Sequence, residues 1–209
     1  MLSLVGNWVI GVPVNDKINK LIEVVKENLS TIDEESANMF IKALFRTMGE
    51  GKIFVVGAGR SGLVAKAFAM RLLHVGFQVY VVGETVTPSM KKGDLLIAVS
   101  GSGETKFPVT AAQVAKSVGA YVVAITSYPN SSLGKLADFV MRIGGRILPE
   151  EESRDYFTRQ ILGIHEPLTP LGTLFELSAM IYLDALIAEI VELMGKSEED
   201  LARRHANIE

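Results

Sequence analysis

The apolar residues near the start of the chain follow helical spacing. Five of them recur at three- and four-residue intervals after Asn15: Ile18, Leu21, Ile22, Val25 and Leu29. This spacing predicts a helix with one apolar face. A second helix is expected over 39–44, with Thr31 and Glu34 forming a capping box ahead of it. Two helices therefore precede the first predicted strand.

From residue 53 onward, short apolar runs alternate with helical segments. The predicted strands are 53–56, 79–82, 95–99, 121–126 and 139–143. Helices are expected at 61–75 and at 131–137, and a further helix with Pro108 in its opening turn is expected to end near Gly119. Because most strands are followed by a helix and are apolar along their length, they favour a parallel sheet covered on both faces. The predicted fold class is α/β, a three-layer α-β-α sandwich with a five-stranded parallel sheet.

The pattern changes after Gly144-Gly145. Residues 149–166 are charged and lack periodicity, which indicates a solvated surface segment or a mobile lid. A helix predicted over 173–194 is apolar around most of its circumference, so burial against another subunit is expected. Ser197 and Asp200 open a final short helix. The chain is thus expected to form one domain, and its parts are N-terminal helices (1–50), a βα core (51–145), a charged inserted segment (146–170) and C-terminal helices (171–209).

Composition narrows the class of protein further. Of the 209 residues, 48% are apolar and 22% are charged, which is ordinary for a soluble domain. No apolar run reaches bilayer length, and Met1–Pro13 lacks the features of a signal peptide, so a cytoplasmic protein is expected. The absence of cysteine excludes disulfides and thiolate metal sites. A formal net charge of −3 without a basic tract argues against nucleic acid.

Histidine and carboxylate spacing gives no sign of a metal centre. The three histidines, His74, His165 and His205, lie far apart and show no ligand spacing. No metal site is therefore expected, although carboxylates alone are able to bind Mg²⁺. His74 is interpreted as a packed or capping residue at the end of its helix, and His165 as loop surface.

A hydroxyl-rich turn, Ser100–Thr105, follows the strand at 95–99. Its glycines let the backbone approach a ligand, and Ser100, Ser102 and Thr105 supply small hydroxyl donors. The helix that follows adds unpaired amides and the positive end of its dipole. These features predict an anion site. An ordinary polar βα turn is the alternative.

A second glycine-rich loop, Gly57–Gly62, has the pattern G-x-G-x-x-G between a strand and a helix. Glu84 follows about 22 residues after Gly62, as the dinucleotide-binding fingerprint requires. A nicotinamide-dependent enzyme is therefore a competing hypothesis. Against it stand the hydroxyl cluster of the other loop and the roughly 60 residues left after the sheet, too few for a substrate domain.

Together the two loops resemble the sugar isomerase (SIS) domain, which binds phosphosugars. Four further motifs resemble its 6-phospho-3-hexuloisomerase branch: Phe68–Leu72, Val82–Thr85, Pro170–Glu176 and Arg204–Asn207. The resemblance covers the chain from about Gly51 to its end. The first 50 residues carry no matching motif, and 149–166 is an insertion relative to shorter members.

The resemblance implies interconversion of D-arabino-hex-3-ulose 6-phosphate and D-fructose 6-phosphate in the ribulose monophosphate pathway. It implies no metal or nucleotide cofactor, a homotetramer with sites shared between subunits, and a separate hexulose-phosphate synthase as pathway partner. An aldose–ketose isomerase for another sugar phosphate and a phosphosugar-sensing module without catalysis are the alternatives.

Moving a carbonyl between C3 and C2 requires a base that carries a proton through an enediol. Glu176 begins an apolar helix, where burial would raise the pKa of its carboxyl; pairing with the helix dipole is the alternative. The resemblance assigns Glu176 as the base, and His205 to proton transfer at substrate oxygens or ring opening, in its own or a neighbouring subunit. Substrate and phosphate contacts are expected at Gly57, Gly59, Arg60, Ser61, Glu84, Ser100, Gly101, Ser102 and Thr105. Lys66, Arg71 and Lys106 are interpreted as surface charge.

Overall fold

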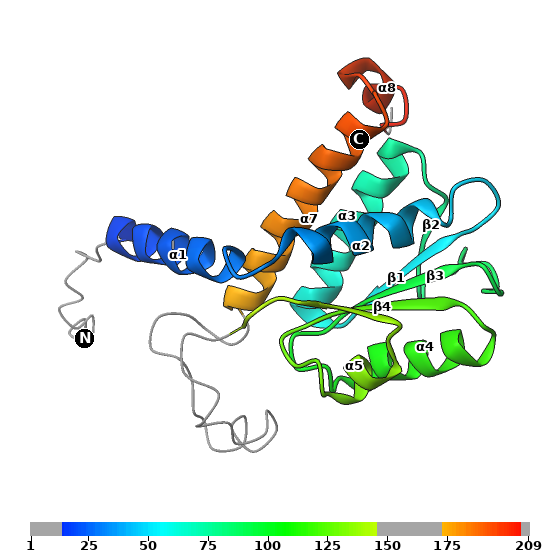
Figure 1. Ribbon diagram of the computed structural model, residues 1–209, viewed down its shortest axis with the longest axis horizontal. Helices are drawn as coiled ribbons and strands as arrows, with labels where there is room; N and C mark the ends of the chain where they lie inside the picture. The colour runs from blue at the N-terminus through cyan, green and yellow to red at the C-terminus, as the bar shows by residue number, and fades with distance from the viewer. Residues whose placement is uncertain (1–13, 146–172, 206–209) are drawn as a thin grey trace, which may run out of the picture.

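The computed structural model describes residues 14–145 and 173–205 (Figure 1). Its elements, in chain order, are α1 (Val14–Leu29), α2 (Glu34–Phe45), β1 (Ile53–Gly57), α3 (Gly59–Val75), β2 (Val79–Val81), β3 (Leu95–Val99), α4 (Lys106–Ser117), β4 (Tyr121–Thr126), α5 (Ser132–Leu136), β5 (Phe139–Arg142), α7 (Thr173–Leu193) and α8 (Glu198–Ala202). The predictions for Met1–Pro13, for the charged segment 149–166 and for residues 206–207 lie outside the described residues, as does His165.

The five strands form one parallel sheet in the order β2-β1-β3-β4-β5, which confirms the predicted sheet. Every residue of β3 is buried, as expected for a central strand that is covered on both faces. The chain moves outward in one direction from β1 to β2 and in the other direction from β3 to β5. The carboxyl ends of β1 and β3 therefore flank the switch point, where such sheets bind ligands.

Alternate residues of the strands feed two apolar clusters, one on each face of the sheet. Val55 and Ile97 pack with α2, α3 and α7, whereas Phe54 and Leu96 pack with α4 and α5. Figure 1 shows these two groups of helices on opposite sides of the strands. Because successive side chains of a strand point to opposite faces, an uninterrupted apolar run supplies both clusters. The predicted three-layer sandwich is confirmed.

The helix ends differ from the predictions in detail. The capping box at Thr31 and Glu34 is wrong: Asp33 is the N-cap of α2 and accepts a hydrogen bond from the Ser36 amide at 2.6 Å. The Thr31 hydroxyl instead donates to the carbonyl of Asn28 at the end of α1. The prediction that Ser197 and Asp200 open the final helix is confirmed, and the two residues form a capping box at the start of α8.

Helix α7 lies in the layer of α3 and contacts both α3 and α1. Its inward residues, such as Leu183 and Ile190, are buried, while Ile181 and Leu193 remain exposed. Burial of this outer face against another subunit stays a prediction. Of the helices in residues 14–145 and 173–205, none combines the length and the apolar content that a bilayer crossing requires.

Candidate active site

The two glycine-rich loops begin side by side at one edge of the sheet. Gly57 at the end of β1 pairs with Val99 at the end of β3. The first loop, Gly57–Gly62, turns too tightly for side chains at its ends. A Cβ on Gly57 would lie 2.8 Å from the Gly62 amide nitrogen, and one on Gly62 would lie 2.9 Å from the Gly57 carbonyl. The glycines therefore bring the start of α3 directly onto the end of β1.

The second loop, Ser100–Thr105, is folded around the buried side chain of Ser100. The Ser100 hydroxyl accepts a hydrogen bond from the Gly103 amide at 3.1 Å and donates to the Thr105 hydroxyl at 3.3 Å. Gly103 has a φ of +66°, a conformation that favours glycine. Thr105 is the N-cap of α4, and within the described part of the chain its side chain does not cap the helix amides. Those amides and the hydroxyls form the donor set that a phosphate requires.

Glu176 connects the start of α7 to the first loop. Its Oε2 lies 3.4 Å from Arg60 Nε, and its Oε1 accepts a hydrogen bond from the Ser61 hydroxyl at 3.4 Å. The side chain of Glu176 is 12% exposed. Burial raises the pKa of its carboxyl, and the Arg60 guanidinium partly opposes that rise. A carboxylate of this kind suits a base that must also return its proton.

Phe175, the residue before Glu176, packs against the second loop. A Cβ on Gly101 would lie only 3.0 Å from Phe175 Cδ1, so the ring rests directly on the glycine backbone. Phe175 is buried in the core. The contact between Gly101 and Phe175 therefore joins the second loop to the residue that directly precedes Glu176.

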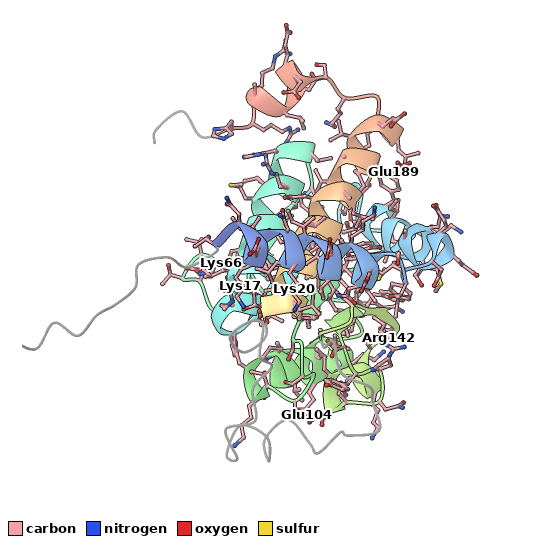
Figure 2. All side chains as sticks on the ribbon, turned by 90° about the vertical axis from the view of Figure 1, so that its left-hand side faces the viewer. Lys17, Lys20, Lys66, Glu104, Arg142 and Glu189 are labelled. Atoms are coloured by element: carbon pink, nitrogen blue, oxygen red, sulfur yellow. The ribbon has the colours of Figure 1, made fainter. Side chains whose placement is uncertain are left out.

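Glu84 lies in the wall of a pocket of about 280 Å³ at the carboxyl ends of β1 and β2. Gly57, Gly62 and Phe107 line the same pocket. Glu84 forms an ion pair with Lys66, with 2.7 Å between the atoms and both side chains about half exposed. Lys66 belongs to α3 and lies at the left of the view in Figure 2. The half-exposed Lys66 is consistent with its interpretation as surface charge, and no sequence spacing indicates its ion pair with Glu84.

His205 lies away from Glu176 within the chain. Its ring lies 4.9 Å from that of His74, near the carboxyl end of α3, whereas the first loop lies at the amino end of that helix. Because α3 has 17 residues, the two ends are roughly 24 Å apart. The described chain thus brings together the two loops and Glu176, places Glu84 in the adjoining pocket, and leaves His205 at a distance. In the described residues, no three histidine, aspartate or glutamate side chains gather in a way that could bind a metal ion.

A protein-family model matches about half of the chain. The SIS domain model matches residues 48–152, and the chain belongs to the SIS domain family. A protein of Bacillus subtilis named 3-hexulose-6-phosphate isomerase is 38% identical over 92% of this chain and 97% of its own length. A protein of Aeropyrum pernix is 51% identical over 94% of this chain and 93% of its own length.

Among solved structures, a crystal structure of a Methanococcus jannaschii protein, whose inferred function is 3-hexulose-6-phosphate isomerase, has a TM-score of 0.73. It is 34% identical and covers 95% of this chain and 100% of its own. Since the Bacillus subtilis relative aligns over 92% of this chain, the similarity includes part of the first 50 residues. The expectation that the likeness begins near Gly51 was therefore too narrow.

Proposed function

We propose that this protein is a 6-phospho-3-hexuloisomerase, which interconverts D-arabino-hex-3-ulose 6-phosphate and D-fructose 6-phosphate. The observation that carries this proposal is a largely buried carboxylate, that of Glu176, which contacts the first loop and directly follows Phe175, the residue that packs against the second loop. The similarity to proteins named 3-hexulose-6-phosphate isomerase supports it. No cofactor is required, because the reaction only moves protons between neighbouring carbons and oxygens.

In the proposed mechanism, the second loop binds the phosphate through its hydroxyls and the first amides of α4. Glu176 removes the proton from C2 of the 3-hexulose, and the C3 carbonyl oxygen gains a proton to give the 2,3-enediol. Glu176 then returns its proton to C3 while the C2 hydroxyl loses one, which leaves the carbonyl at C2. Because Glu176 both accepts and donates, a raised carboxyl pKa serves each half of the reaction.

The neighbouring residues have supporting roles in this proposal. Arg60 keeps the Glu176 carboxyl ionised often enough to act as a base and can contact a sugar oxygen or the phosphate. Glu84 and Lys66 lie in the pocket beside the first loop, where they can hydrogen-bond the hydroxyls of the sugar. Gly57, Gly59 and Ser61 bring the backbone of the first loop close to the substrate.

His205 acts on substrate oxygens in the site of a neighbouring subunit, because its own chain holds it far from Glu176. This arrangement needs an oligomer, and we propose a homotetramer with shared sites. Two exposed apolar rows offer contact surfaces, one on α1 (Val14, Ile18 and Ile22) and one on α3 (Leu63, Met70 and Leu73). In this proposal the enzyme is cytoplasmic and acts in the ribulose monophosphate pathway, where a separate hexulose-phosphate synthase supplies its substrate.

The test compares Glu176→Gln with wild-type protein in an assay of fructose 6-phosphate formation. Gln keeps the size of the side chain but cannot accept the proton, so kcat should fall by about a thousandfold. Glu189→Gln is the matched control, since Glu189 is an exposed glutamate further along α7 and lies far from the loops in Figure 2. Unchanged turnover by Glu176→Gln would refute Glu176 as the base. Tight phosphosugar binding without turnover by the wild type would favour a sensing module.

A further inference from the structure

Glu104 is the one charged residue of the second loop, and its carboxylate is turned toward the start of α5. It accepts a hydrogen bond from the Ser132 amide at 2.8 Å and another from the Ser132 hydroxyl at 2.6 Å. The next residue of α5 adds a third connection, because the Leu133 amide donates to the Gly103 carbonyl at 2.9 Å. Three hydrogen bonds thus join the second loop to the first turn of α5.

The same contact leaves no free space between the loop and α5. A Cβ on Gly103 would lie 1.9 Å from the Ser131 hydroxyl oxygen, and that hydroxyl is itself occupied as the N-cap of α5. On its other side the loop meets the Phe175 ring at Gly101. The second loop is therefore held between α5 and α7, with Glu104 forming its polar attachment.

The negative charge of Glu104 and its hydrogen bonds have different effects on phosphate binding. A carboxylate one residue before Thr105 repels a bound phosphate, so its charge alone weakens anion binding. Its hydrogen bonds, however, fix the donors of the loop. The Glu104 amide donates to the Ser102 hydroxyl at 3.2 Å, so holding Glu104 in place also holds Ser102. The attachment and the charge thus act in opposite directions on phosphate binding.

We propose that Glu104 is a positioning residue that clamps the second loop to α5 and thereby keeps the Ser102 and Thr105 hydroxyls ordered for the phosphate. The proposal rests on the proposed function, because it assumes that this loop binds the phosphate of the substrate. Glu104 does not contact the reacting carbons. Its loss therefore weakens phosphosugar binding and leaves the chemical step intact.

Two substitutions separate the clamp from the charge. Glu104→Ala removes both, whereas Glu104→Gln removes the charge but keeps an oxygen for the Ser132 amide and a donor for the Ser132 hydroxyl. Asp138→Ala is the matched control: Asp138 also accepts from a backbone amide, that of Val122 at 2.8 Å, but at the amino edge of the sheet. Calorimetric titration with fructose 6-phosphate and with inorganic phosphate gives Kd, and the isomerase assay gives KM and kcat.

The clamp predicts that Glu104→Ala raises the Kd of both probes and the KM by about tenfold, with kcat within about twofold of wild type. Glu104→Gln keeps the clamp and loses the repelling charge, so it should bind both probes at least as tightly as wild type. Asp138→Ala should bind both probes within about twofold of wild type. If Glu104→Ala fails to fold, Ser132→Ala removes the hydroxyl donor alone and should raise Kd by about threefold.

Equal or tighter binding by Glu104→Ala, or by Ser132→Ala in its place, would overturn the proposal, as would a fall in kcat at unchanged KM. Calorimetry does not depend on turnover. A wild-type protein that binds both probes but forms no product would therefore refute the proposed function and leave the clamp to be judged by the binding data. A wild-type protein that binds neither probe would overturn both.

Discussion

Substituting Gly101 with alanine tests how the structure sets the distance between the phosphate loop and the base. The new Cβ would lie 3.0 Å from Phe175 Cδ1 and 3.1 Å from Cγ. Carbon atoms in ordinary contact are about 3.5–4.0 Å apart, so the ring must retreat by roughly 0.5 Å. Because Glu176 follows Phe175 directly, its carboxylate should move by a similar amount.

The size of the effect follows from this displacement. A misplacement of about 1 Å costs about a hundredfold in rate, so half of that predicts a loss of roughly tenfold in kcat for Gly101→Ala. Crowding the core should also lower the free energy of unfolding by about 1–3 kcal/mol. Adding Phe175→Leu makes room for the new methyl group, and the double variant should regain part of the kcat that Gly101→Ala loses.

The assay is steady-state formation of fructose 6-phosphate, with thermal unfolding measured on the same samples. Gly51→Ala is the control for crowding alone, since a Cβ there would lie 2.8 Å from Thr47 Cα, before the start of β1 and at the opposite edge of the sheet. Gly51→Ala should lower stability and leave kcat unchanged. A kcat of Gly101→Ala equal to that of wild type would refute the inference that Phe175 sets the position of Glu176.

Three further predictions concern the base and the subunit arrangement. Burial raises the pKa of the Glu176 carboxyl, and Arg60 lowers it. Arg60→Met should therefore raise that pKa further and move the acid limb of the kcat/KM profile to higher pH. An acid limb at unchanged pH would contradict the pairing of Arg60 with Glu176. The buried charge also costs stability at a pH above its folded-state pKa, so Glu176→Gln should be more stable than wild type at neutral pH. This margin should shrink as the pH falls through the raised folded-state pKa of Glu176 and be lost once the pH is below the unfolded-state pKa. Glu176→Gln and His205→Asn subunits, each inactive alone, should regain activity after mixing and subunit exchange, because about a quarter of the shared sites would carry both native residues. No recovery in exchanged oligomers would argue for sites within one chain.

The fold was predictable because the strands are short apolar runs whose side chains pack on both faces of the sheet. Ile53–Val56 and Leu95–Val99 contain no polar residue, which only a covered parallel strand explains well. Helix ends were less predictable. Thr31 and Asp33 are both good capping residues two positions apart, and the choice depends on where α1 ends, which its contacts with α7 influence.

The candidate site was predictable to the extent that it follows from topology. Gly57–Gly62 and Ser100–Thr105 both follow strands, and parallel strands bring such loops to one edge. Other contacts of the site join residues that no helical or strand spacing relates. They are the ion pair of Lys66 with Glu84, the hydrogen bond of Ser132 to Glu104 and the ring contact of His205 with His74. Those contacts arise only when the layers are assembled, so the sequence alone could not supply them.

A crystal structure of the protein with fructose 6-phosphate bound tests the central claim most directly. The account predicts a phosphate within hydrogen-bonding distance of the Ser100, Ser102 and Thr105 hydroxyls, with C2 and C3 about 3–3.5 Å from the Glu176 carboxylate. A phosphate bound elsewhere, or a carbon chain that runs away from Glu176, would contradict it.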